Sequence, residues 1–131
     1  MPKRVLIHGT VLLGLLLAAR TVPAQEASEV AVRDWLSDLV TRIDAADRAG
    51  LRTGSGRSSA GRRAGTVVVH VEIAPDGAVR RAEIERSSGS KGLDQRALRA
   101  VRGAGPLTAP PAALLGEAGV ADLSIPVELG R

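Results

Sequence analysis

The chain has 131 residues, which is enough for one modest domain and a leader but not for two hydrophobic cores. It contains no cysteine, so disulfides, thiolate metal sites and thiol nucleophiles are excluded. The formal charge is +4, yet basic and acidic residues balance from Gly65 to the C-terminus, and Trp35 is the only aromatic residue. A near-neutral domain without aromatic side chains to stack on bases is not expected to bind nucleic acid.

Residues 1–24 have the features of a secretion signal. Lys3 and Arg4 give the positive start, residues 5–19 are mostly apolar, and Ala24 ends a small-residue cleavage site. As a helix, the apolar run would span about 22 Å, short of the roughly 30 Å hydrocarbon core of a membrane. We therefore predict a cleaved signal peptide and export to the periplasm. The alternative is a short uncleaved anchor in the inner membrane, with the domain facing the periplasm.

One ionisable side chain inside the apolar run keeps the anchor alternative open. His8 would be costly in a lipid environment, and residues of this kind are often functional there. The simpler interpretation is a histidine without a role in a cleaved signal peptide.

The region before residue 65 divides into a helix and a linker. Over residues 28–50, apolar residues recur at three- and four-residue spacing and polar residues occupy the opposite side, which predicts an amphipathic helix with a packing face. Ser28 is suited to cap its first turn and Gly50 to end it. Residues 51–64 are rich in Gly, Ser and Arg without apolar periodicity, so they are predicted to form a linker.

Residues 65–131 alternate between strand and helix signals. Alternating valines predict a strand over 65–73, and a Pro-Asp-Gly turn connects it to a second strand over 78–86. A helix is predicted over 93–104, and apolar alternation returns over 122–129. We therefore predict an α+β fold: a small three-stranded antiparallel sheet in the order β-β-α-β, with a helix on one face, preceded by the amphipathic helix.

Three finer expectations follow from single positions. A bulge near Arg80 and Arg81 would bring the second strand into register. Pro126 lacks an amide hydrogen, which favours an edge position for the last strand. Asp94 lies near the N-terminus of the 93–104 helix, where the helix dipole favours an anion. Along the same helix, the arginines are expected to point outward; they are Arg96, Arg99 and Arg102.

The order of these signals resembles one known family, that of the TonB C-terminal domain. Its hairpin is similar to Gly65–Val69, Pro75–Val79 and Ser87–Gly89, its helix to Leu93–Ala104, and its closing segments to Pro106–Pro111 and Ile125–Val127. The resemblance covers about half of the chain. It implies a periplasmic domain without enzymatic activity or cofactors.

In TonB proteins this domain links an inner-membrane motor, ExbB and ExbD, to outer-membrane receptors in transmembrane transport. A short receptor segment, the TonB box, adds as a strand beside the domain's last strand, as in other cases of recognition by strand addition. Carried over by position, the partner-binding residues would be Leu123, Ser124, Ile125, Pro126, Val127, Glu128 and Leu129. The leader resembles the family's anchor helix in part, so a retained anchor would make His8 a candidate for motor coupling.

Two departures from the family leave alternatives open. The long Pro-rich spacer is absent, and the 51–64 linker could stretch to about 46 Å at most. The Tyr-Pro step that usually precedes the first strand is missing as well. The chain could therefore be a transducer, a free adaptor that binds another envelope protein, or a structural homodimer that pairs through the same edge.

Enzymatic activity and metal binding are not expected. Within the mature domain the only base and nucleophile candidates are His70, Ser87 and Ser88, and no motif connects them. The two serines are better explained as part of a turn.

Overall fold

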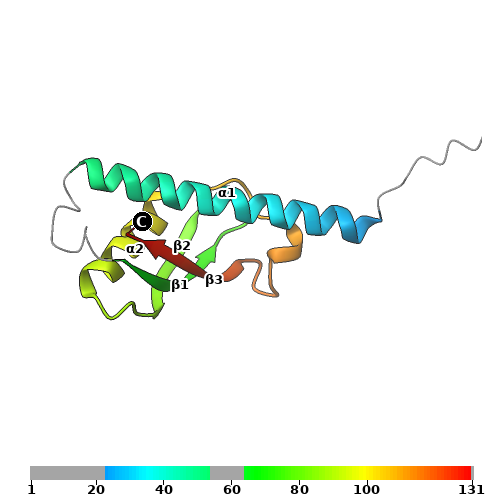
Figure 1. Ribbon diagram of the computed structural model, residues 1–131. Coiled ribbons are helices and arrows are strands. Elements are labelled where there is room, and N and C mark those ends of the chain that lie inside the picture. The colour runs from blue at the N-terminus through cyan, green and yellow to red at the C-terminus, as the bar shows by residue number, and fades with distance from the viewer. Residues whose placement is uncertain (1–22, 54–63, 131) are drawn as a thin grey trace, which may run out of the picture.

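The computed structural model describes residues 23–53 and 64–130 (Figure 1). Residues 1–22 of the predicted leader, His8 among them, and residues 54–63 of the predicted linker lie outside the described residues. The elements in chain order are α1 (Ala24–Arg52), β1 (Gly65–Ile73), β2 (Val79–Arg86), α2 (Lys91–Gly103), the short 3-10 helix η2 (Ala112–Leu114) and β3 (Ala121–Leu129). In the described part of the chain, no helix is both long and apolar enough to span a bilayer.

The three strands form one antiparallel sheet in the order β2-β1-β3. Along the central strand, alternate side chains are buried, namely Val67, Val69, Val71 and Ile73. The residues between them are exposed or half-buried, so one face of the sheet is packed and the other meets solvent. This confirms the predicted α+β fold, and it confirms β3 as an edge strand.

The two outer strands differ in regularity. The register between β1 and β2 shifts twice, once where Glu72 pairs with Arg81 but Ile73 pairs with Val79. Arg80 is therefore an extra residue, and the predicted bulge is confirmed at this position. β3 pairs with β1 over nine consecutive residues without any shift.

The turn between β1 and β2 also fixes the segment after α2. Gly77 has φ of +91°, a backbone conformation that favours glycine, and Asp76 accepts a hydrogen bond from the Ala78 amide. Leu107 donates its amide hydrogen to the Gly77 carbonyl at 3.0 Å. A Cβ atom at Gly77 would lie 2.0 Å from the Leu107 carbonyl oxygen, so this contact requires glycine.

Both helices cover the packed face of the sheet. Trp35, Leu39 and Ile43 of α1 belong to the same buried cluster as the inward side chains of α2 and of the sheet. The Trp35 indole N–H donates to the Thr108 carbonyl at 2.9 Å, which fixes α1 to the irregular segment before η2. The amphipathic helix is thus an integral part of the core, as Figure 1 shows from its course along the whole domain.

The ends of α1 differ from those expected. The helix begins before Ser28, with Pro23 at the N-cap position, so Ser28 is not its cap. It continues through Gly50, which does not adopt a positive φ, and Thr53 bonds back to the carbonyls of Ala49 and Gly50. The Thr53 hydroxyl, together with the partial burial of Leu51, stabilises the last turn of α1 beyond Gly50.

The outward position expected for Arg96 is wrong. Its side chain is only 9 % exposed, and its Nε and Nη2 donate to the two carboxylate oxygens of Asp47 at 2.6 and 2.7 Å. The prediction assumed that only one side of α2 is covered, by the sheet, whereas α1 packs against a second side of the helix. A buried arginine is tolerated there because this two-bond ion pair compensates its charge.

Candidate functional site

The outer edge of β3 is the first component of the candidate site. Leu123 to Leu129, which the family resemblance proposed as the binding strand, all lie in this strand. β1 pairs with one side of it, and the sheet described here has no fourth strand on the other side.

The backbone of β3 alternates between the sheet and the free edge. Ala74 donates its amide hydrogen to Ala78 across the hairpin, so even-numbered residues of β1 bond toward β2 and odd-numbered ones toward β3. Val69 then exchanges hydrogen bonds with Ile125, its partner in the register, while Ser124 and Pro126 turn their backbone groups outward. Pro126 therefore removes no bond from the sheet.

Within residues 23–53 and 64–130, cover is found only on the first part of this edge. Leu115 forms an isolated bridge with Ala121, and the Gly116 amide donates to the Val120 carbonyl at 3.0 Å. The segment after η2 thus shields the start of β3, and the accessible stretch begins near Leu123.

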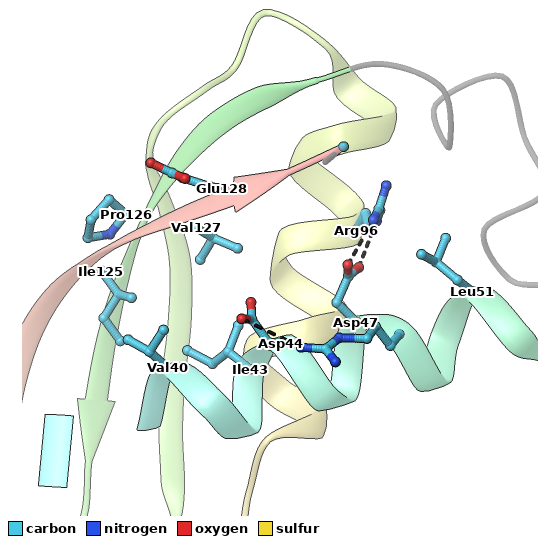
Figure 2. Close-up of a pocket in the computed structure, with 12 residues that line it drawn as sticks. Val40, Ile43, Asp44, Asp47, Leu51, Arg96, Ile125, Pro126, Val127 and Glu128 are labelled. Atoms are coloured by element: carbon cyan, nitrogen blue, oxygen red, sulfur yellow. Dashed lines mark hydrogen bonds and ion pairs between the residues drawn. The ribbon is translucent and has the colours of Figure 1, made fainter. Parts of the chain in front are cut away.

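A groove of about 530 Å³ separates β3 from α1 (Figure 2). Ile125 and Val127 point from the strand toward α1, while Pro126 and Glu128 point away from it (Figure 2). The opposite wall is formed by α1 residues, namely Val40, Ile43, Asp44, Asp47, Arg48 and Leu51. The free edge of β3 therefore has a partly apolar helix beside it and does not open onto bare solvent.

Four charged side chains of the groove form two ion pairs. The Asp47–Arg96 pair closes one end, and hydrogen bonding to Asp47 raises the pKa of Arg96 above its usual value despite the opposing effect of burial. Nη1 of Arg96 is buried and has no hydrogen-bond partner. Arg48 and Asp44 form a longer contact of 3.9 Å in which both side chains are largely exposed.

Polar pairs lie on the solvent-facing side of the sheet and at the turn before α2. His70 Nε2 lies 2.9 Å from Asp122 Oδ1, and Arg81 lies 2.7 Å from Glu83. Ser87 and Ser88 both donate their hydroxyls to Asp94, so they hold the turn before α2 as expected. Within residues 23–53 and 64–130, no three potential metal ligands gather.

The strand was predicted from the sequence, but the groove beside it was not. Val40 is one of the apolar residues of the 28–50 helix, for which a packing face was predicted, but it is 50 % exposed and lines the groove. One signal was available. α1 has apolar residues at the adjacent positions Leu39 and Val40, so its apolar surface is wider than the single stripe needed to face one core.

The comparisons with known proteins identify one family. A model of the Gram-negative bacterial TonB protein C-terminal matches residues 57–128, more than half of the chain. No curated protein and no solved structure matches. Members of this family are envelope or periplasmic proteins whose C-terminal domain is a non-enzymatic interaction module, generally tied to energy transduction for outer-membrane transport. The chain belongs to the family of the TonB C-terminal domain.

Proposed function

We propose that this chain is a periplasmic protein-binding module that takes up an extended partner segment as a new strand beside β3. The partner is an outer-membrane receptor segment of the TonB-box kind or a segment of another envelope protein. The observation that carries the proposal is the regular, unbulged edge of β3 from Leu123 to Leu129, with a groove along it.

The backbone of this edge is suited to strand addition. Ser124 presents an N–H and a carbonyl outward, and Pro126 presents a carbonyl, by the alternation derived above. Each backbone hydrogen bond contributes about 1 kcal/mol net, so a few bonds supply affinity and the side chains supply selectivity. Catalysis is no part of the proposal, because the serine hydroxyls and His70 bond to separate carboxylates.

Energy transduction depends on the leader. If residues 1–24 are retained as an anchor, His8 becomes the candidate for coupling to ExbB and ExbD, and the chain acts as a transducer. If they are cleaved, the chain is a free periplasmic adaptor. Intact mass of the protein released from its native envelope separates the two, since a species that lacks Met1 to Ala24 excludes motor coupling through His8.

The binding edge is tested by Ser124→Pro. Proline removes the outward N–H and adds a ring at the edge, while the bonds of Ile125 to β1 remain. We expect binding of receptor-derived peptides to weaken at least about tenfold by calorimetry, since one lost hydrogen bond and a steric clash together exceed about 1.4 kcal/mol.

Ser124→Ala is the matched control, because it keeps the N–H, and it should bind like the wild type. Equal affinity of the proline variant, with an unchanged fold by circular dichroism, would contradict strand addition at β3. The alternative of a structural homodimer predicts instead that the molecular mass rises from that of a monomer to that of a dimer as the protein concentration increases. Ser124→Pro should then remain a monomer. Analytical ultracentrifugation measures both.

A further inference from the structure

The helix layer of this domain is wider than its sheet. An α-helix with its side chains is about 10 Å across, so two helices side by side cover roughly 20 Å. Three strands about 4.8 Å apart span roughly 14 Å. α2 packs on β1 and β2, and α1 packs mainly on α2. The groove is lined by residues of α1 and β3, which places α1 on the β3 side of the helix layer. The groove lies between α1 and β3.

We infer that α1 selects the partner: the groove takes an extended segment of another protein whose alternate residues are apolar and face α1. This inference rests on the proposed strand addition and adds the chemical class of the segment. α1 lies outside the residues that match the family, so this wall is a feature of the present chain beyond the matched domain.

The side-chain directions at the groove define the required pattern. Side chains of neighbouring strands point to the same faces of a sheet, so every second residue of an added strand would lie level with Ile125 and Val127. These two residues point toward α1, where Val40, Ile43 and Leu51 line the opposite wall (Figure 2). An added apolar side chain would therefore be enclosed between β3 and α1, and the residues between would face solvent beside polar side chains.

A second copy of this chain does not fit the groove. If two β3 strands pair antiparallel about a two-fold axis, the helices of both copies lie on the same face of the combined sheet. The two α1 helices would then occupy the same space above the line where the two strands meet. If the strands pair in parallel, the second copy is turned over. Its exposed side chains, among them Asp122 and Ser124, would then point into the partly apolar groove, where burial of a carboxylate is unfavourable. The occupant is therefore a separate extended segment.

Other parts of the chain lack the required pattern. Residues 54–63 contain no large apolar residue, and residues 5–19 are apolar in continuous runs without alternation. The accessible stretch of β3, Leu123 to Leu129, sets the length of the segment that could pair with it.

The test uses two labelled ten-residue peptides of identical composition. The first places valine at every second position among serine, threonine and lysine, and the second groups the valines so that the alternation is lost. Fluorescence anisotropy with the purified chain should give at least about tenfold tighter binding of the alternating peptide, since enclosing two valines is worth more than about 1.4 kcal/mol.

The chain offers a matched pair of variants on α1. Val40 lines the groove and is 50 % exposed, whereas Val30 is 51 % exposed and does not line it. Lysine is a better helix former than valine, so neither Val40→Lys nor Val30→Lys should unfold the helix. We expect Val40→Lys to reduce the preference for the alternating peptide to about twofold or less, and Val30→Lys to leave it unchanged.

The outcomes separate this inference from the proposed function. If both peptides bind equally, and Val40→Lys binds like the wild type while Ser124→Pro abolishes binding, strand addition stands and selection by α1 is wrong. If Ser124→Pro has no effect, strand addition itself fails. A complex that contains two copies of the chain would overturn the assigned occupant. The expected result is loss of binding in Ser124→Pro and loss of preference in Val40→Lys.

Discussion

The two edges of the sheet differ in regularity and in charge. The β2 edge is interrupted by two register shifts and carries a dense row of charged residues, namely Arg80, Arg81, Glu83, Glu85 and Arg86. The β3 edge keeps one register from end to end and alternates buried apolar residues with exposed ones. Bulges and charges are devices that prevent strands from pairing at an edge. β2 is protected in this way, whereas in the described part of the chain β3 has only Pro126 and the short cover at Ala121.

The difference indicates that the ability to pair with a further strand is a property of the β3 edge and not of the sheet as a whole. A domain of this size with two open edges would be prone to aggregate, and one with none could not add a strand. The β3 edge is also the one bordered by α1, which leaves a groove instead of a flat, exposed edge. The following predictions test this contrast, beginning with the largest expected effect.

Removing the side chain that holds α1 should destabilise the whole domain. Trp35 is 6 % exposed and bonds to Thr108, so Trp35→Ala should lower the free energy of unfolding by about 3–5 kcal/mol. Urea denaturation measures this loss. The control Val30→Ala removes an exposed side chain and should change stability by less than about 0.5 kcal/mol. A small effect of Trp35→Ala would show that α1 is not a fixed wall of the groove.

Breaking the ion pair at the end of the groove should have the next largest effect. Asp47→Ala leaves the buried Arg96 without its partner, and we expect a loss of about 3 kcal/mol in urea denaturation. Asp44→Ala removes the exposed partner of Arg48 and should cost less than about 0.5 kcal/mol. Similar losses for both variants would contradict the assigned burial of the Asp47–Arg96 pair.

Hydrogen exchange should distinguish the two edges without any substitution. The Ser124 amide faces outward from β3, so it should exchange quickly in the unbound protein and slow at least about tenfold when a partner strand is bound. The Ile84 amide on β2 should not change, because the bulged edge accepts no strand. Protection at Ile84 but not at Ser124 would reverse the assignment of the edges.

The smallest effect concerns the turn that follows β2. Desolvation raises the pKa of Asp94, but hydrogen bonds from the Ser87 hydroxyl and from the Ser88 amide and hydroxyl outweigh it and hold the pKa below its usual value. A carboxylate whose pKa is lower in the folded state stabilises the protein above its unfolded pKa, near 3.9, and loses that contribution as the pH falls through the folded value.

Stability measured by denaturation between pH 5 and pH 2 should therefore decline less steeply in Asp94→Asn than in the wild type. The side chain is partly exposed, so the change should be modest. Identical pH profiles would contradict a role of these hydrogen bonds in lowering the pKa.

Much of the fold could be predicted because its signals are local. Alternating valines specify β1, Pro-Asp-Gly specifies the turn, and the phase of Val79 against Ile84 indicates a bulge that the structure places at Arg80. Pro126 identified the edge strand for a chemical reason, because an interior strand needs its amide hydrogen. The ends of α1 could not be derived from Ser28 and Gly50, since cap preferences are weak compared with the burial of neighbouring side chains.

The sequence by itself determined the strands, their faces, the edge position of β3 and the family, because backbone chemistry and side-chain periodicity act over a few residues. Only the tertiary structure decided how α1 lies against the sheet, since that position depends on contacts between residues far apart in the chain, such as Trp35 with Thr108 and Asp47 with Arg96. The same long-range packing buries Arg96, exposes Val40 and forms the groove at the β3 edge.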